Sequence, residues 1–151
     1  MGKGILEGIR YKKGYTKSQI NDLLEEVLEK VHLSKDCLHR KNYELSGGQC
    51  QRAAIARAII SKPDFIICDE ITSALDVIVQ DEIIDLFLEL KKEMELSCLF
   101  ISHDIALVKD ICQNMMVMKQ GKIMEQGNSK EIIMCPKTSY TQNLIDSILS
   151  I

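Results

Sequence analysis

The stretch that most constrains this chain is residues 45–52, which read LSGGQCQR and lead into a strongly helical segment at 53–60. Ser46 is of a type that commonly caps a helix N-terminus, because its side-chain oxygen accepts a hydrogen bond from a first-turn N–H group. The glycines after it, Gly47 and Gly48, let a ligand approach the helix start, and the positive end of the helix dipole attracts an anion. The pattern predicts a phosphate site here. An ordinary capped helix after a Gly-Gly turn is the alternative that these residues alone leave open.

A second signal lies in residues 65–70, which read FIICDE and follow a turn at Pro63. The uncharged apolar run predicts a fully buried strand of a parallel sheet. Asp69 and Glu70 then stand at the C-terminal end of the strand, where open α/β sheets bind their ligands. Asp69 suits coordination of Mg²⁺ on a nucleotide, and Glu70 suits polarising an attacking water. The alternative is a pair of carboxylates that only solvates the end of a strand.

Two further segments continue the pattern. Residues 72–76 read TSALD, a turn-rich connector, and a helix is expected over 77–95. A second apolar strand at 98–101 leads into Ser102-His103-Asp104. A histidine at the tip of a neighbouring parallel strand can donate a hydrogen bond to a terminal phosphate, although a lone histidine is more often structural.

In this order, LSGGQ, a strand ending in DE, SALD and a strand ending in SHD resemble the second half of an ATP-binding-cassette (ABC) ATPase domain. The resemblance covers the chain from about Ser18 to its end, and the order and spacing of the motifs make it specific. In the family's terms they are the signature motif (45–49), the Walker B strand (65–70), the D-loop (73–76) and the H-loop (His103). The amino-acid sequences of these motifs, together with YTQNLI near the C-terminus, are most similar to those of the oligopeptide, dipeptide and nickel importer ATPases.

The resemblance implies an α/β fold, namely the C-terminal half of a P-loop NTPase (ABC ATPase) domain. It would comprise a helical subdomain at residues 1–48, incomplete in this chain, and the Walker B to C-terminal part of the ATPase core at 49–151. The core would hold a parallel sheet with flanking helices. Helical spacing of the apolar residues independently predicts an amphipathic helix over 17–33.

The last third of the chain reads as a hairpin followed by two helices. A glycine turn divides two short apolar segments within 114–126, and helices are expected at 129–134 and 139–149. Met115, Met116 and Met118 are interpreted as core filling, because methionine adapts to irregular gaps and the segment is strand-like.

The resemblance also implies how the signature would work. Relatives act as head-to-tail dimers that bind each ATP between the Walker A loop of one subunit and the signature of the other. Ser46 and Gly48 would contact the γ-phosphate in trans, with Gly47 and Gln49 beside them. Asp76 would tie the two sites together across the dimer.

For the remaining residues the resemblance implies catalytic and metal-binding roles. Asp69 would hold Mg²⁺ mostly through water, because this ion keeps several of its waters. Glu70 would be the general base, and His103 would steady the γ-phosphate. The implied cofactors are ATP and Mg²⁺.

One family motif has no counterpart in these residues. The 151 residues contain no G-x-x-x-x-G-K-[ST] pattern, the Walker A loop whose amides and lysine hold the phosphates. The sequence is therefore expected to be a cassette truncated before its signature region, and inactive alone. Two interpretations stay open: part of an ATPase subunit of a peptide or nickel importer, or a non-enzymatic remnant or interaction module.

Composition bounds the partners and the location. The net charge of −3 argues against nucleic-acid binding, which calls for a basic surface, and against an ABC-type DNA-repair ATPase. No apolar run approaches the roughly 18 residues of a spanning helix. The six cysteines are scattered without a C-x-x-C pair, which is typical of a reducing compartment.

We expect a cytoplasmic protein, peripheral on the inner face of the membrane. Its partners would be membrane-spanning subunits, a second ATPase subunit and, indirectly, an extracytoplasmic solute-binding protein.

Overall fold

The computed structural model describes residues 1–10, 14–72 and 75–149. The chain divides into two compact units, Met1–Leu99 and Phe100–Ile151, and each has a hydrophobic core of its own. The subdomain boundary expected after residue 48 is a different division and stays a prediction. Within the described residues, none of the helices combines the length and apolar character needed to cross a membrane.

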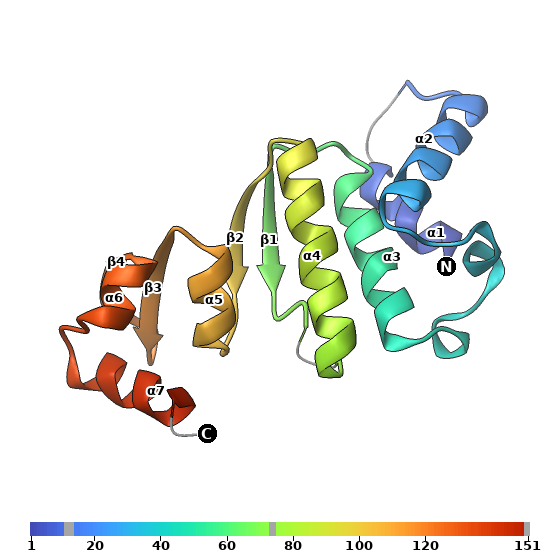
Figure 1. Cartoon of the computed structure of the whole chain (residues 1–151). Coiled ribbons are helices and arrows are strands. Elements are labelled where there is room, and N and C mark those ends of the chain that lie inside the picture. Colours follow the sequence, from blue (N-terminus) through green and yellow to red (C-terminus); the bar gives the residue numbers. More distant parts are fainter. Residues whose placement is uncertain (11–13, 73–74, 150–151) are drawn as a thin grey trace. The chain divides into compact units, whose positions relative to one another are not determined.

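The first unit consists mainly of helices that lie on one side of a short strand pair (Figure 1). Its elements are α1 (Gly2–Leu6), η1 (Glu7–Ile9), α2 (Lys17–Lys30), η2 (Lys35–His39), η3 (Asn42–Glu44), α3 (Gly47–Ile59), β1 (Phe65–Asp69), α4 (Val77–Glu93) and β2 (Ser97–Ile101). The last two residues of β2 lie beyond the end of this unit at Leu99. The two strands are neighbours and run the same way, so the predicted parallel pairing is confirmed.

Helix α2 is the amphipathic helix predicted from the apolar spacing. It begins after Thr16, whose side chain and that of Gln19 each accept a hydrogen bond from the other residue's backbone N–H. It ends at Lys30 rather than at the predicted residue 33, because His32 adopts a left-handed backbone conformation with φ of 52°. That conformation ends the α-helical hydrogen-bond ladder.

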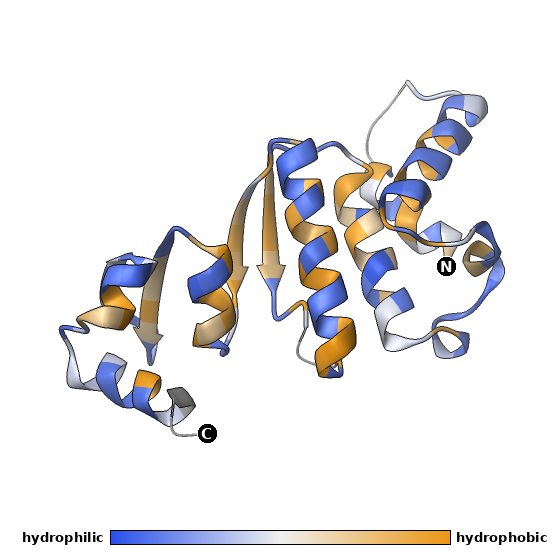
Figure 2. Ribbon diagram, in the orientation of Figure 1, coloured by the Kyte–Doolittle hydropathy of each residue, from blue (hydrophilic) through white to orange (hydrophobic). Residues whose placement is uncertain are grey.

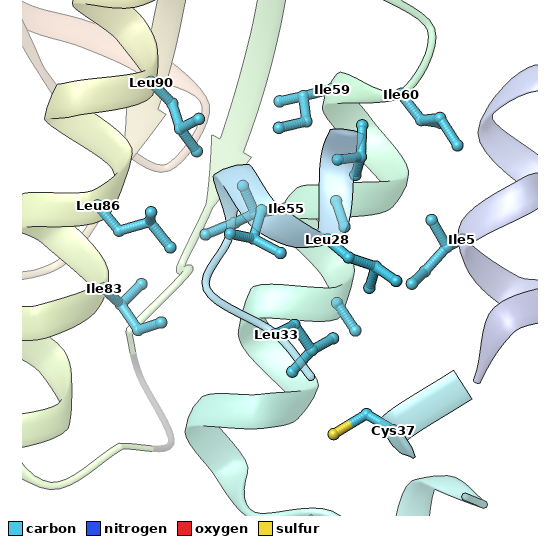
Figure 3. Close-up of a cluster of buried hydrophobic side chains, with 14 of the residues drawn as sticks. Ile5, Leu28, Leu33, Cys37, Ile55, Ile59, Ile60, Ile83, Leu86 and Leu90 are labelled. Carbon is cyan, nitrogen blue, oxygen red and sulfur yellow. The ribbon is translucent and has the colours of Figure 1, made fainter. Parts of the chain in front are cut away.

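The core of the first unit lies on both sides of α3. Figure 3 shows Leu86 and Leu90 of α4 facing Ile55 and Ile59 of α3, with Ile5 of α1 on the opposite side. Burying one such aliphatic side chain is worth about 1.5–3 kcal/mol, so this cluster is a major source of the unit's stability. Apolar and polar positions alternate along α3 and α4 in Figure 2, as helices with one covered face require.

Strand β1 corrects one expectation. The sequence predicted a strand buried on both faces, but only Cys68 is fully buried and Ile66 partly so. Phe65 and Ile67 point the other way and are 54% and 63% exposed. Successive strand residues face opposite sides, and within this unit the described helices pack on one side only. The apolar run therefore identified the strand correctly and its burial wrongly.

The second unit contains a hairpin and three helices. They are α5 (Ile105–Ile111), β3 (Asn114–Lys119), β4 (Lys122–Asn128), α6 (Ser129–Met134) and α7 (Ser139–Leu149). The predicted hairpin is confirmed: β3 and β4 pair antiparallel, and the turn uses left-handed Gln120 and Gly121, with φ of 49° and 74°. The two predicted helices at 129–134 and 139–149 are also confirmed.

The methionines of β3 are only partly core residues. Met115 is buried, in a cluster that includes Val117 and Ile145. Met116 and Met118 lie on the other face of the strand and are 52% and 56% exposed. Core filling is therefore confirmed for the first and wrong for the other two, because strand alternation places them on an uncovered face.

A buried carboxylate joins the hairpin to the segment before α7. Glu125 of β4 accepts hydrogen bonds from the backbone N–H groups of Lys137, at 2.9 Å, and Thr138, at 3.4 Å. The Lys137 N–H lowers the pKa of Glu125 most. The Thr141 hydroxyl, the Thr138 N–H and the Lys137 ammonium also lower the pKa, against the raising effect of burial.

Candidate functional site

The predicted cap at the start of α3 is present. The Gln49 N–H donates to Ser46 Oγ at 3.2 Å, and the Ser46 N–H donates to Gln49 Oε1 at 3.1 Å. This reciprocal pair fixes both side chains against the helix start. Because Ser46 Oγ accepts from Gln49, its own hydroxyl hydrogen can point outward to an anion. The N–H groups of Gly47 and Gly48 belong to the first turn, where a helix offers no internal acceptor.

The two glycines have a second role that the sequence analysis missed. A Cβ on Gly48 would lie 2.8 Å from Val79 Cγ1, and one on Gly47 would lie 3.1 Å from Leu75 Cδ2. The absence of side chains therefore lets the signature segment pack closely on the start of α4. The two adjacent glycines are a sequence signal for a close contact. The sequence could not identify the contacting residue, because Val79 lies far from the glycines in the chain.

Asp76 caps α4. Its Oδ1 accepts a hydrogen bond from the Val79 N–H at 3.1 Å, and α4 begins at Val77, as predicted. The same carboxylate was expected to act across a dimer, and that role stays a prediction. Ser73 and Ala74 of the expected D-loop lie outside the described residues.

The candidate metal ligand Asp69 and the candidate general base Glu70 lie at the strand end where they were expected. Asp69 is the last residue of β1 and Glu70 follows it directly, both exposed. Glu70 has a left-handed backbone, with φ of 47°, which costs roughly 1–2 kcal/mol for a residue with a side chain. Four other described non-glycine residues share this conformation, so it is not itself a mark of function.

These residues fit the binding of Mg²⁺ together with a phosphate. Among the described residues, no group of three or more His, Cys, Asp or Glu side chains could hold a metal by itself. Mg²⁺ is typically bound by one or two carboxylates, waters and phosphate oxygens, a donor set to which Asp69 could contribute. The metal role of Asp69 and the base role of Glu70 stay predictions.

His103 belongs to the second unit, in the turn between β2 and α5. The turn is held by the Asp104 N–H, which donates to Ser102 Oγ at 3.0 Å, and by Asp104, which caps α5 through Ala106 and Leu107. The His103 side chain is exposed. Its contact with a terminal phosphate stays a prediction.

Arg52, the last residue of the run at 45–52, has a structural role that the sequence did not predict. Its guanidinium donates to the Val31 carbonyl oxygen and to Glu82 Oε2, each at 3.2 Å, so it joins α3 to the end of α2 and to α4. Only the fold reveals these partners, because they lie far from Arg52 in the sequence.

Comparison with known proteins shows which proteins this chain is similar to. Residues 5–73 match the family model described as ABC transporter. A Brucella ovis protein named for peptide import and ATP binding is 39% identical over 150 residues, which is 99% of this chain and 47% of the relative. The oligopeptide transport ATP-binding protein OppF of Haemophilus influenzae is 40% identical over 149 residues, 98% of this chain and 45% of the relative.

A solved structure supports the fold assignment. It is a dimeric post-hydrolysis state of an ATP-binding cassette bound to ADP and Pi, with a TM-score of 0.69 and 28% identity. The match covers 83% of this chain and 54% of that one. The chain thus spans about half the length of these relatives. In its signature cap, its strand ending in two carboxylates and its sequence over 150 residues, the chain is similar to the ATPases of ABC transporters.

Proposed function

We propose that this chain forms part of the ATP-hydrolysing subunit of a peptide importer. The observation that carries the proposal is the exposed, capped start of α3, where Ser46 and two first-turn N–H groups are available to a phosphate. The names of the two relatives support peptides as the transported solute. The motif sequences also suggested nickel as a transported solute, but the names of these two relatives give no support for nickel.

In this proposal, α3 acts on ATP that another subunit holds. The Ser46 hydroxyl and the Gly48 N–H donate hydrogen bonds to the γ-phosphate, and the α3 dipole adds attraction for its charge. Gly47 and Gln49 shape this contact, and Asp76 acts across the dimer. Phosphoryl transfer depends mainly on such positioning and charge stabilisation.

The strand-end residues would supply the remaining chemistry. Asp69 helps to hold Mg²⁺, which neutralises phosphate charge when bound. Glu70 accepts a proton from the attacking water, and His103 donates a hydrogen bond to the γ-phosphate.

The proposed partners follow from this arrangement. A second ATPase subunit completes each site, and the related dimeric cassette with ADP and Pi supports that idea. Membrane-spanning subunits would carry the solute, with a solute-binding protein acting indirectly, and the ATPase would lie at the inner face of the membrane.

A non-enzymatic remnant or interaction module is the second candidate. It is favoured by the lack of a G-x-x-x-x-G-K-[ST] pattern in these 151 residues, because those groups would have to come from elsewhere.

A chimera separates the two candidates. The 149-residue segment of the Haemophilus influenzae protein that matches this chain is replaced by the corresponding residues of this chain, and ATP hydrolysis is measured against the parent. Hydrolysis that Glu70→Gln abolishes supports the ATPase. A folded chimera that binds ATP but does not hydrolyse it favours the remnant.

A further inference from the structure

Arg52 connects three helices of the first unit through one side chain. It lies on α3, and its Nη1 donates to the carbonyl oxygen of Val31, the C-cap residue of α2. Its Nη2 donates to Glu82 Oε2 on α4, also at 3.2 Å. The Arg52 side chain is only 16% exposed, so its bond to Val31 is partly shielded from water, whereas Glu82 is 58% exposed and its bond to Arg52 lies at the surface.

The α2 contact satisfies an acceptor that the helix itself leaves open. At the end of α2, the Leu33 N–H donates to the Leu28 carbonyl and the His32 N–H donates to the Glu29 carbonyl. Neither bond uses the Val31 carbonyl, which can therefore accept a hydrogen bond from a side chain outside the helix. A cation is also favourable here, because this is the negative end of the helix dipole. Arg52 supplies both the donor and the charge.

The α4 contact extends the close packing of the signature glycines. Gly48 and Arg52 are four residues apart on α3, and Val79 and Glu82 are three apart on α4, so each pair shares a helix face. The Gly48–Val79 approach and the Arg52–Glu82 ion pair are therefore successive contacts of one α3–α4 interface. A shift of α3 along or around its axis would disturb both.

We infer that Arg52 is a positioning residue, which holds the first turn of α3 in register with α2 and α4 and so presents Ser46 and Gly48 to phosphate. The inference rests on the proposed function for its phosphate part. Arginine suits this place because its planar fork directs two nitrogens to two acceptors at once, whereas lysine offers a single point charge.

The test uses the 151-residue chain, with amide hydrogen exchange and NMR shifts read residue by residue. In Arg52→Met, which keeps the aliphatic stem, exchange at Gln49 and Cys50 should become about tenfold faster while Leu86 and Leu90 of α4 keep their protection. Arg57→Met is the matched control, because Arg57 lies on the same helix, is 56% exposed and pairs only loosely with Glu7, at 3.8 Å.

A second arm titrates the chain with inorganic phosphate. Wild type and Arg57→Met should show saturable shifts at the Gly47 and Gly48 amides, and Arg52→Met should need about tenfold more phosphate. If wild type shows no such shifts, the proposed phosphate contact fails while the exchange data still decide the positioning role. Unchanged exchange at Gln49 and Cys50 in Arg52→Met overturns that role.

Two milder variants decide the question if Arg52→Met does not fold. Arg52→Lys and Glu82→Gln each weaken the contacts without removing the stem, and both should raise exchange at Gln49 by a smaller factor. Wild-type exchange in both variants overturns the inference.

Discussion

Gly48 and Val79 approach so closely that no side chain fits between them: a Cβ on Gly48 would lie 2.8 Å from Val79 Cγ1. This contact joins the signature segment to the first turns of α4, which Asp76 caps. The glycine at position 48 of the signature thus allows close packing as well as ligand access. Helix propensity and packing make opposite demands on Gly48→Ala, since alanine favours the helix but fills the contact.

Gly48→Ala should destabilise the chain despite the better helix propensity of alanine. Overpacking a tight contact costs about 1–3 kcal/mol, against a gain of up to about 1 kcal/mol from replacing glycine within a helix. Denaturant unfolding would measure the net loss, and adding Val79→Ala should recover part of it. Gly4→Ala in α1 is the control, because a Cβ there meets nothing within 4 Å, and it should be neutral or stabilising. Equal effects of Gly4→Ala and Gly48→Ala would contradict the packing role.

Gly8→Ala should be more damaging than Gly48→Ala. A Cβ on Gly8 would lie 2.1 Å from the Arg57 backbone oxygen and 2.7 Å from Ile60 Cγ2, and a helix backbone cannot move aside as a side chain can. We expect a loss of about 3 kcal/mol or undocking of η1 from α3. The midpoint of urea unfolding, with hydrogen exchange across residues 2–9, would distinguish these outcomes. Wild-type stability in this variant would show that η1 does not pack on α3 as described.

The sequence predicted well those features that short-range chemistry decides. The cap at Ser46, the start of α4 after Asp76 and the turn at Gln120-Gly121 each depend on neighbouring residues, and each is present. These signals need no knowledge of what packs where.

The sequence could not predict which apolar faces are covered. Phe65 and Met116 belong to correctly placed strands, yet both are exposed, because burial depends on elements that pack from a distance. The bonds of Arg52 to Val31 and Glu82 were invisible for the same reason. Local propensity decides the element, and tertiary packing decides its environment.

Glu125 should make the stability of the second unit depend on pH. Its pKa is lowered from 4.5 in the folded chain, chiefly by the Lys137 N–H, so its ionised form is stabilised by folding. This contribution to the free energy of unfolding is complete above about pH 4.5, the unfolded value, and is lost as pH falls through the lower folded pKa.

Glu125→Gln should therefore destabilise the chain at neutral pH and flatten the loss of stability below pH 4.5. Unfolding midpoints measured at steps from pH 7 to pH 3 would check this. Glu131→Gln, which removes an exposed carboxylate of α6, is the control for the change in charge. Parallel pH curves for wild type and Glu125→Gln would show that the carboxylate contributes nothing through its bonds to Lys137 and Thr138.

Glu70→Gln should remove ATP hydrolysis in the chimera while leaving ATP binding and dimer formation intact. The amide keeps the size of the carboxylate and cannot accept a proton from water, and loss of a general base typically lowers the rate about 10²–10⁴-fold. Steady-state hydrolysis and equilibrium nucleotide binding would be measured on the same samples. Glu95→Gln is a matched control, because Glu95 is also exposed and also has a left-handed backbone, with φ of 53°. If both variants hydrolyse ATP at the parent rate, Glu70 only solvates the end of β1. If both lose activity equally, the effect comes from the backbone conformation or the charge, and the base lies elsewhere.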